Sequence, residues 1–111
     1  MIGRKHKILG GLEVIGSTRP AKEINGDSYD FFEKDDQCYI YVGDATGHGV
    51  TSGMVGTMAS ALIEAYGQTL IEGDKVVTEV NRLLFPRLYG GRIMTLALLR
   101  WDVEKKKLFL T

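Results

Sequence analysis

The stretch Gly43-Asp44-Ala45-Thr46-Gly47-His48-Gly49 decides the fold, because it lies between a strand-like and a helix-like pattern. The apolar run before it, residues 38–42, delivers the carboxylate of Asp44 at the end of a strand. Its three glycines allow the backbone to bend closely around whatever that carboxylate holds. A second acidic cluster, Gly26-Asp27-Ser28-Tyr29-Asp30, lies upstream. We expect folding to bring Asp27 against Asp44.

The region around both aspartates has the pattern of a β-hairpin. Residues 27–33 and 38–44 are rich in aromatic and β-branched side chains, and the polar residues 34–37 join them. One register collects the apolar side chains on one face. Its pairs are Glu33 with Cys38, Phe31 with Ile40, and Tyr29 with Val42. The same register sets Asp27 opposite Asp44, with Cβ atoms about 4.5–5.5 Å apart, close enough for both carboxylates to share metal ions.

Two helices are predicted after the hairpin. The first begins at Val50 and ends at Gly67. Its expected core stripe consists of Met54, Met58, Leu62 and Tyr66, broadened by Val55, Ala59 and Ala61. The second begins at Asp74, a candidate N-cap, and ends at Pro86. Its expected buried residues are Val76, Val77, Val80, Leu83 and Leu84.

The remaining segments have strand patterns. A short strand is predicted over 12–17, before Pro20. After a turn at Gly90-Gly91, residues 92–101 are apolar on both alternating faces, which favours a central strand covered on each side. A final strand over 107–111 creates a sheet edge with no visible cover.

Composition limits the function classes. The chain has 111 residues and a formal net charge of zero, which predicts one domain and argues against nucleic acid or an anionic membrane as the main partner. No apolar segment has the length of a membrane span. The single cysteine, Cys38, is predicted to be a buried thiol in a reducing cytoplasm. Residues 1–10 are interpreted as a linker remnant and 11–111 as the domain.

Two facing carboxylates repel each other unless a positive charge lies between them. Oxygen ligands favour Mg²⁺ or Mn²⁺ over zinc, which prefers His or Cys. The alternative is that Asp27 caps a turn and Asp44 caps the following helix, as aspartates commonly do. Spacing alone leaves both interpretations open.

The loop around His48 also permits more than one interpretation. Its glycines fit a phosphate cradle at a helix N-terminus, but it lacks the Gly-Lys-Ser/Thr of a nucleotide-binding P-loop. His48 is either a general acid or a hydrogen-bonding surface residue. The residues alone do not decide between these roles.

Two linked motifs carry a resemblance that spans nearly the whole chain. The segments 20–30 and 43–50, followed by Met94-Thr95-Leu96-Ala97-Leu98, resemble the bacterial SpoIIE/RsbU-type branch of the protein phosphatase 2C-like, metal-dependent phosphatases. The resemblance implies an α+β fold, an α-β-β-α sandwich of antiparallel sheets flanked by helices. Only the N-terminal part of that sandwich is expected here. It also implies two Mn²⁺ or Mg²⁺ ions at one end.

The resemblance also implies roles for individual residues. Asp44 is similar to the carboxylate that bridges both metals, Ala45 would supply a backbone carbonyl ligand, and Asp27 would be the second acidic contributor. A water between the metals would attack the phosphorus of a phosphoserine or phosphothreonine directly. The expected substrate is a phosphorylated protein such as an anti-sigma factor antagonist, and an acid role for His48 is suggested.

The chain departs from the family pattern after Thr111. Members of the family continue into an Ala-Gly-His segment, a Ser-Asp-Gly segment and a last aspartate, and these later aspartates complete the metal site. Without them we expect one weak metal site. A competing hypothesis is a noncatalytic binding or regulatory module. The open edge at residues 107–111 further predicts homo-oligomers formed by strand pairing.

Overall fold

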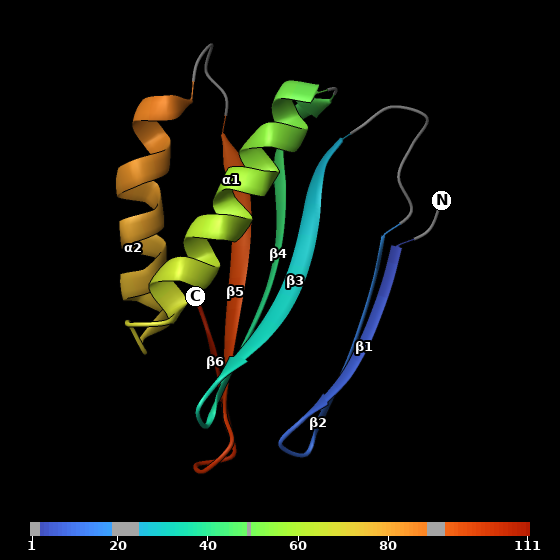
Figure 1. The fold of residues 1–111 in the computed structure, drawn as a ribbon, viewed down its shortest axis with the longest axis vertical. Coiled ribbons are helices and arrows are strands. Elements are labelled where there is room, and N and C mark those ends of the chain that lie inside the picture. Colours follow the sequence, from blue (N-terminus) through green and yellow to red (C-terminus); the bar gives the residue numbers. More distant parts are fainter. Residues whose placement is uncertain (1–2, 19–24, 49, 89–92) are drawn as a thin grey trace.

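The structure, a computed structural model, describes residues 3–18, 25–48, 50–88 and 93–111. The described residues form two antiparallel sheets and two α-helices, arranged as in Figure 1. In chain order the elements are β1 (Gly3–Leu9), β2 (Leu12–Thr18), β3 (Asn25–Lys34), β4 (Gln37–His48), α1 (Val50–Gly67), α2 (Gly73–Leu84), a single 3₁₀ turn η1 (Phe85–Arg87), β5 (Met94–Asp102) and β6 (Lys107–Leu110).

The larger sheet has the strand order β3-β4-β5-β6, and every neighbouring pair is antiparallel. The predicted hairpin register is confirmed, with Glu33 opposite Cys38 and Asp27 opposite Asp44. Side chains alternate between the two faces of a strand. One register therefore decides which residues of β3, β4 and β5 share a face.

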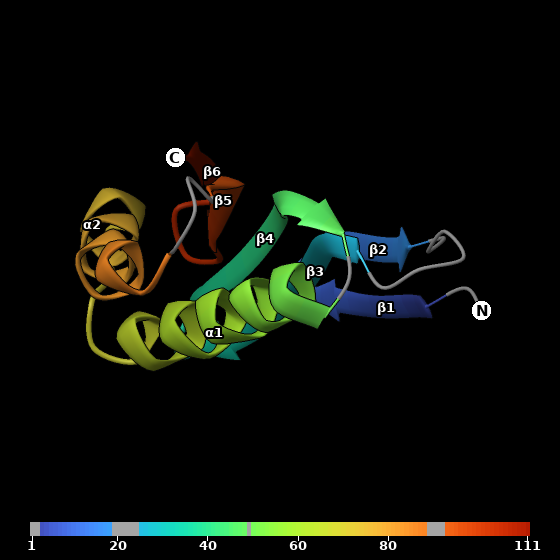
Figure 2. The same cartoon turned by 90° about the horizontal axis from the view of Figure 1, so that it is seen from above.

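Helices α1 and α2 cover one face of this sheet (Figure 2). Two tyrosines of β4 are almost fully buried beneath them. The hydroxyl of Tyr41 hydrogen bonds with Oγ of Ser60 in α1. The hydroxyl of Tyr39 lies within hydrogen-bond distance of the carbonyl oxygens of Leu70 (3.0 Å) and Ile71 (2.8 Å). These contacts satisfy polar groups inside an otherwise apolar core, which fixes α1 and the connection to α2 over the sheet.

The bounds of α1 were predicted correctly, and its buried face was predicted in part. Val55 and Ala59 are buried and Leu62 and Tyr66 pack against the core, as expected, but Met54 does not. The sheet-facing residues are Val55, Ala59 and Ile63, whereas Met54 is 58% exposed. Residues spaced by three or four along a helix share a face, and α1 has apolar residues on two such faces. The sequence pattern therefore did not distinguish the face that meets the sheet from the face that includes Met54.

The second helix begins one residue before the predicted start. Its N-cap is Glu72, and Asp74 lies in the first turn. Val76, Val80 and Leu84 are buried as expected, while Val77 and Leu83 are only partly buried. The predicted turn at Gly90-Gly91 lies outside the described residues.

Strand β5 is central, as predicted, but it is not covered equally on both faces. Leu98, which lies on the helix side with Tyr41, is buried. Ala97, on the other side, is only partly buried. The helices therefore supply most of the cover, and the opposite face of the sheet stays partly open.

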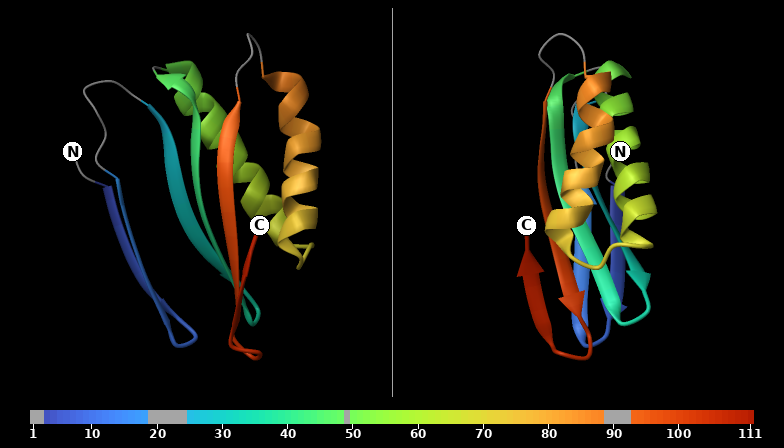
Figure 3. Two further views of the ribbon diagram at one scale, coloured as in Figure 1. Left: turned by 180° about the vertical axis from the view of Figure 1, so that it is seen from behind. Right: turned by 90° about the vertical axis from the view of Figure 1, so that its left-hand side faces the viewer.

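The segment interpreted as a linker remnant instead contains β1, which pairs with β2 along its whole length. This hairpin contacts the face of the sheet that lies away from the helices (Figure 3). Lys7 Nζ lies 2.9 Å from Glu33 Oε1, and Tyr29 donates a 2.9 Å hydrogen bond to the carbonyl of Gly16. The glycines after residue 9 had suggested a linker, but they form the tight hairpin turn, where Gly10 has φ +52°.

The described layers are thus helices, a four-stranded sheet and a two-stranded sheet. They correspond to three of the four layers of the expected α-β-β-α sandwich. No helix in the described ranges combines the length and the apolar character that crossing a membrane requires.

A buried cluster of charged groups lies where β5 approaches the turn into β6. Arg100 Nη1 donates a 2.6 Å hydrogen bond to Oε1 of Gln37 and lies 3.9 Å from Oδ2 of Asp102. The Arg100 guanidinium carbon is 4.2 Å from the ring centroid of Phe109. Asp102 also accepts a 2.9 Å hydrogen bond from the backbone N–H of Lys105. These contacts join β4, β5 and β6 at one end of the sheet.

Candidate metal site at the end of the sheet

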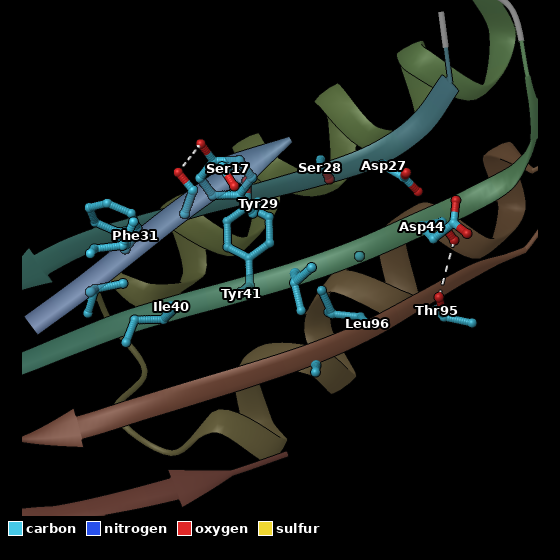
Figure 4. A pocket seen from close by; sticks show the side chains of 16 residues that line it. Ser17, Asp27, Ser28, Tyr29, Phe31, Ile40, Tyr41, Asp44, Thr95 and Leu96 are labelled. Carbon is cyan, nitrogen blue, oxygen red and sulfur yellow. Dashed lines mark hydrogen bonds between the residues drawn. The ribbon is translucent and has the colours of Figure 1, made fainter. Parts of the chain in front are cut away.

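Three polar residues form one rung across three neighbouring strands. Asp27 of β3 lies opposite Asp44 of β4, and Asp44 lies opposite Thr95 of β5. Directly opposed residues project from the same face of a sheet, and all three are exposed on the face away from the helices. Figure 4 shows them side by side at one end of the strands.

The rung lies at one end of an open groove of about 770 Å³. Strand β2 forms one wall through Val14 and Ile15, and the sheet forms the floor through Ile40, Val42 and Ala97. Most of the groove surface is apolar, and the two carboxylates lie at its end (Figure 4). The carboxylates of the groove therefore lie at one end, while Ser17 and Tyr29 line it farther along.

The two carboxylates strongly influence each other. A hydrogen bond with the side chain of Asp44 raises the pKa of Asp27, and partial burial and the negative charge of Asp44 add to this increase. One proton shared between two carboxyl groups relieves the repulsion of two negative charges. A cation held between them would relieve it equally well and displace the proton.

The donors present fit a hard cation. Mg²⁺ and Mn²⁺ prefer carboxylate and carbonyl oxygens and retain several waters, so they need few protein ligands. Within the described ranges, no cluster contains three or more His, Cys, Asp or Glu side chains. The pair at Asp27 and Asp44 would therefore supply two carboxylates to a bound ion and leave its remaining positions to backbone carbonyls and water.

The chain does not leave the sheet at Gly43. Strand β4 continues to His48, and the pairing with β3 contains an irregularity. Asn25 pairs with His48 and Asp27 pairs with Asp44. The segment of β4 between these two pairs is therefore longer than the segment of β3 that it faces. The expected bend thus takes the form of a β-bulge beside the aspartates, a common device next to functional sites.

Ala45 follows Asp44 on β4, and its side chain is buried, at 2% exposure. A ligand role for its backbone carbonyl stays a prediction. His48 is placed in β4 by its backbone, but its side chain lies outside the described residues, so its acid role also stays a prediction. Cys38 is buried, as predicted, and burial is the main cause that raises the pKa of its thiol.

Thr95 was not among the predicted site residues. Its Oγ1 donates a 3.4 Å hydrogen bond to the backbone carbonyl of Asp44, which ties β5 to the residue that carries the carboxylate. The alternation of side chains along β5 could have indicated Thr95, because residues two apart on a strand, such as Thr95 and Ala97, lie on the same face. The link to Asp44 requires the β4–β5 register, which local sequence patterns do not specify.

Comparison with known proteins identifies the family of this chain. The sequence profile of the family described as Stage II sporulation protein E (SpoIIE) matches residues 34–111. This match covers more than half of the chain, from β4 to β6. The chain belongs to the SpoIIE family.

A curated relative and two solved structures are similar to this SpoIIE-family chain. Phosphoserine phosphatase RsbU of Bacillus subtilis (strain 168) is 21% identical over 105 residues, which span 95% of this chain and 31% of the relative. The RsbU and RsbW domains of Rv1364c from Mycobacterium tuberculosis superpose with a TM-score of 0.66 at 17% identity, covering 93% of this chain and 26% of that one. The SiaA-PP2C domain of Pseudomonas aeruginosa superposes with a TM-score of 0.66 at 26% identity. The match covers 78% of this chain and 37% of that one.

These similarities confirm the expected SpoIIE/RsbU-type, protein phosphatase 2C-like fold and its partial extent. The chain spans about a third of the curated relative it matches. The activity of a whole relative therefore does not transfer directly to these 111 residues.

Proposed function

We propose that the chain is the N-terminal part of a metal-dependent phosphatase domain that hydrolyses phosphoserine or phosphothreonine on a protein. The observation that carries the proposal is the opposition of Asp27 and Asp44 at the end of the groove. The curated relative, named a phosphoserine phosphatase, supports the reaction class. A signalling protein such as an anti-sigma factor antagonist is the proposed substrate, and the cytoplasm the proposed location.

The proposed metal ligands are the carboxylates of Asp27 and Asp44 and the backbone carbonyl of Ala45. A bound Mn²⁺ or Mg²⁺ supplies a Lewis acid that activates water and balances the charge of a phosphoryl group. Thr95 holds the backbone of Asp44 through its hydroxyl and so limits movement of that residue. A carboxylate held at a fixed position keeps its orientation toward an ion, which limits reorganisation during the reaction.

Hydrolysis of a phosphoserine peptide in Mn²⁺ tests this function. The full chain should release phosphate, and Asp44→Asn should lower the rate by at least about 100-fold, the order expected when a key electrostatic group is lost. Asp36→Asn is the matched control, since Asp36 lies in the exposed turn at the other end of the β3–β4 hairpin. Equal rates for the chain and Asp44→Asn would contradict the proposal.

A noncatalytic binding or regulatory module is the second candidate. It is favoured by the small donor set, since no cluster of three potential ligands occurs in the described part of the chain. Metal binding that depends on Asp44, together with no phosphate release above the Asp44→Asn background, would support this role over catalysis.

A further inference from the structure

Tyr29 and Gly16 form a close contact between the two sheets. The hydroxyl of Tyr29 on β3 donates a 2.9 Å hydrogen bond to the backbone carbonyl of Gly16 on β2. The tyrosine ring lies against the same residue, because a Cβ atom at Gly16 would overlap with Cε2 and lie 2.6 Å from Cδ2 of the ring. The contact therefore depends on a glycine at this position.

The backbone conformation does not require glycine at position 16. The described glycines with positive φ are Gly10 and Gly11, at the turn of the β1–β2 hairpin. Gly16 instead pairs with Lys5 inside the ladder. Glycine in the interior of a strand weakens that strand. What Gly16 supplies is therefore the space that lets the side chain of Tyr29 reach the backbone of β2.

Tyr29 is also the neighbour of Asp27 on one face of β3. Residues two apart on a strand project from the same face, and they lie about 7 Å apart along the strand. Both side chains line the groove, with Tyr29 farther from its end (Figure 4). Tyr29 lies opposite Val42, and Asp27 lies opposite Asp44. The hydrogen bond to Gly16 thus restrains β3 beside the two carboxylates.

The ladder holds Asp27 from one direction only. Pairing of β3 with β4 is irregular between Asn25 and Asp27, and a bulge disrupts the ladder locally. Asp27 is therefore the last regularly paired residue before the irregularity. When a strand turns about its own axis, the side chains on one face move together. A restraint on Tyr29 consequently also limits the movement of Asp27.

We propose that Tyr29 is a positioning residue for the metal site, because its contact with Gly16 holds the carboxylate of Asp27 toward Asp44. The proposal rests on the metal role proposed above for the two aspartates. Loss of the contact lets this end of β3 turn, which moves one carboxylate away from the other. A bound ion then loses part of its coordination, since it accepts oxygen ligands only at short distances. The β1–β2 hairpin thereby belongs to the site although it carries none of the proposed ligands.

A second aromatic contact provides a matched control. Nε1 of Trp101 on β5 donates a 3.2 Å hydrogen bond to the backbone carbonyl of Gly10 in the same hairpin. Trp101 follows Thr95 by six residues on β5, which places it about 20 Å from the rung along the strand. Both contacts join an aromatic side chain of the four-stranded sheet to a glycine carbonyl of the hairpin. They differ in their distance from the aspartates.

Hydrogen exchange of the metal-free full chain, followed by NMR, tests the positioning. In Tyr29→Phe we expect the amides of residues 27–29 to exchange about fivefold faster, the factor that corresponds to the loss of one typical hydrogen bond. The amides of residues 38–41 in β4 serve as the reference for global opening. Trp101→Phe should leave residues 27–29 unchanged relative to this reference. Unchanged exchange in Tyr29→Phe, or an equal increase in both variants, would overturn the proposal.

Calorimetric titration with Mn²⁺ links the positioning to the metal site. Tyr29→Phe should weaken binding about tenfold, the lower end of the effects found for residues that orient metal ligands. Trp101→Phe should bind as tightly as the unaltered chain. Faster exchange in Tyr29→Phe with unchanged Mn²⁺ affinity would overturn the role in the metal site. If the unaltered chain bound no Mn²⁺ but exchange responded as expected, the proposed function would fail while the positioning of Asp27 by Tyr29 would stand.

Gly16→Ala disrupts the same contact from the other strand. The added methyl group displaces the ring of Tyr29, so exchange at residues 27–29 and Mn²⁺ affinity should change in the same direction as in Tyr29→Phe. The double variant Gly16→Ala/Tyr29→Phe should be no more affected than Gly16→Ala alone, because both substitutions disrupt one contact. Additive effects of the two substitutions would show that the two residues act separately and would contradict the proposal.

Discussion

The two ends of the four-stranded sheet differ in how their charged side chains are arranged. At the end near the start of β3, two aspartates face each other in solvent, and their proximity raises the pKa of Asp27. At the other end, Arg100 and Asp102 are buried and joined by hydrogen bonds to Gln37 and to the backbone of Lys105. One end collects like charges, and the other pairs opposite charges.

The difference distinguishes a structural cluster from a functional one. Burying charged groups is tolerated when partners compensate them. Gln37, Asp102 and the ring of Phe109 do so for Arg100, although its buried Nε has no hydrogen-bond partner among the described residues. Like charges placed together stabilise nothing by themselves, so the pair at Asp27 and Asp44 needs a shared proton or a cation between the carboxylates, and the metal ion proposed above would be such a cation. Shifted pKa values in a groove are typical of functional sites for the same reason.

Removal of Arg100 should produce the largest change. Arg100→Ala leaves Asp102 and Gln37 without their partner and removes the contact with Phe109. We expect a loss of about 3 kcal/mol in the free energy of unfolding, measured by urea denaturation. Arg82→Ala, which removes an exposed pair with Glu79, should have little effect. Equal losses in both variants would show that the buried cluster is not structural.

A smaller effect with a clear pH dependence is expected at Asp102. Hydrogen bonds from the backbone of Lys105 and from Gln37 lower the pKa of Asp102. A lowered pKa in the folded state adds stability above the unfolded value, 3.8, and this stability is lost as pH falls through the folded pKa. Asp102→Asn should therefore be less stable than the unaltered chain at neutral pH, with the gap closing in acid. A gap that is constant with pH would contradict this account.

Substitution of Asp27 should change the free energy of unfolding in the opposite direction, and this change should be the smallest of the three. The raised pKa of Asp27 favours the folded state below the unfolded value, 3.8, and this advantage is lost as pH rises through the folded pKa. Without added metal, Asp27→Asn should therefore be more stable at neutral pH, by roughly 0.5 kcal/mol. The gain should vanish in acid. Thermal unfolding across pH measures it, and destabilisation of the variant at neutral pH would show that the pair does not repel.

Much of the fold was predictable because its strongest signals are local. The β3–β4 register follows from period-two alternation around a short polar turn, and it placed Asp27 against Asp44 correctly. The bounds of α1 followed from its helical period. The buried face of α1 was predictable only in part, because apolar residues occupy two faces and only tertiary packing selects Ile63 over Met54.

The remaining errors arose where pairing between distant segments decides the structure. Strand β1 gains its partner only by folding back on β2, which basic residues near a Gly-Gly pair did not indicate. Arg100 lies within a segment interpreted as an apolar strand, and its burial depends on Gln37, 63 residues away. The hydrogen bond from Thr95 to Asp44 likewise joins residues 51 apart. Such contacts follow from topology rather than from local sequence.

The most direct test is calorimetric titration of the full chain and of Asp44→Asn with Mn²⁺. Because the described donor set contains two carboxylates in one pair and Mn²⁺ retains several waters, we expect one weak site in the unaltered chain. The heat of binding should be absent in Asp44→Asn and unchanged in Asp36→Asn. Equal binding by the chain and Asp44→Asn, or two tight sites in the chain, would contradict the assignment of this rung as the metal site.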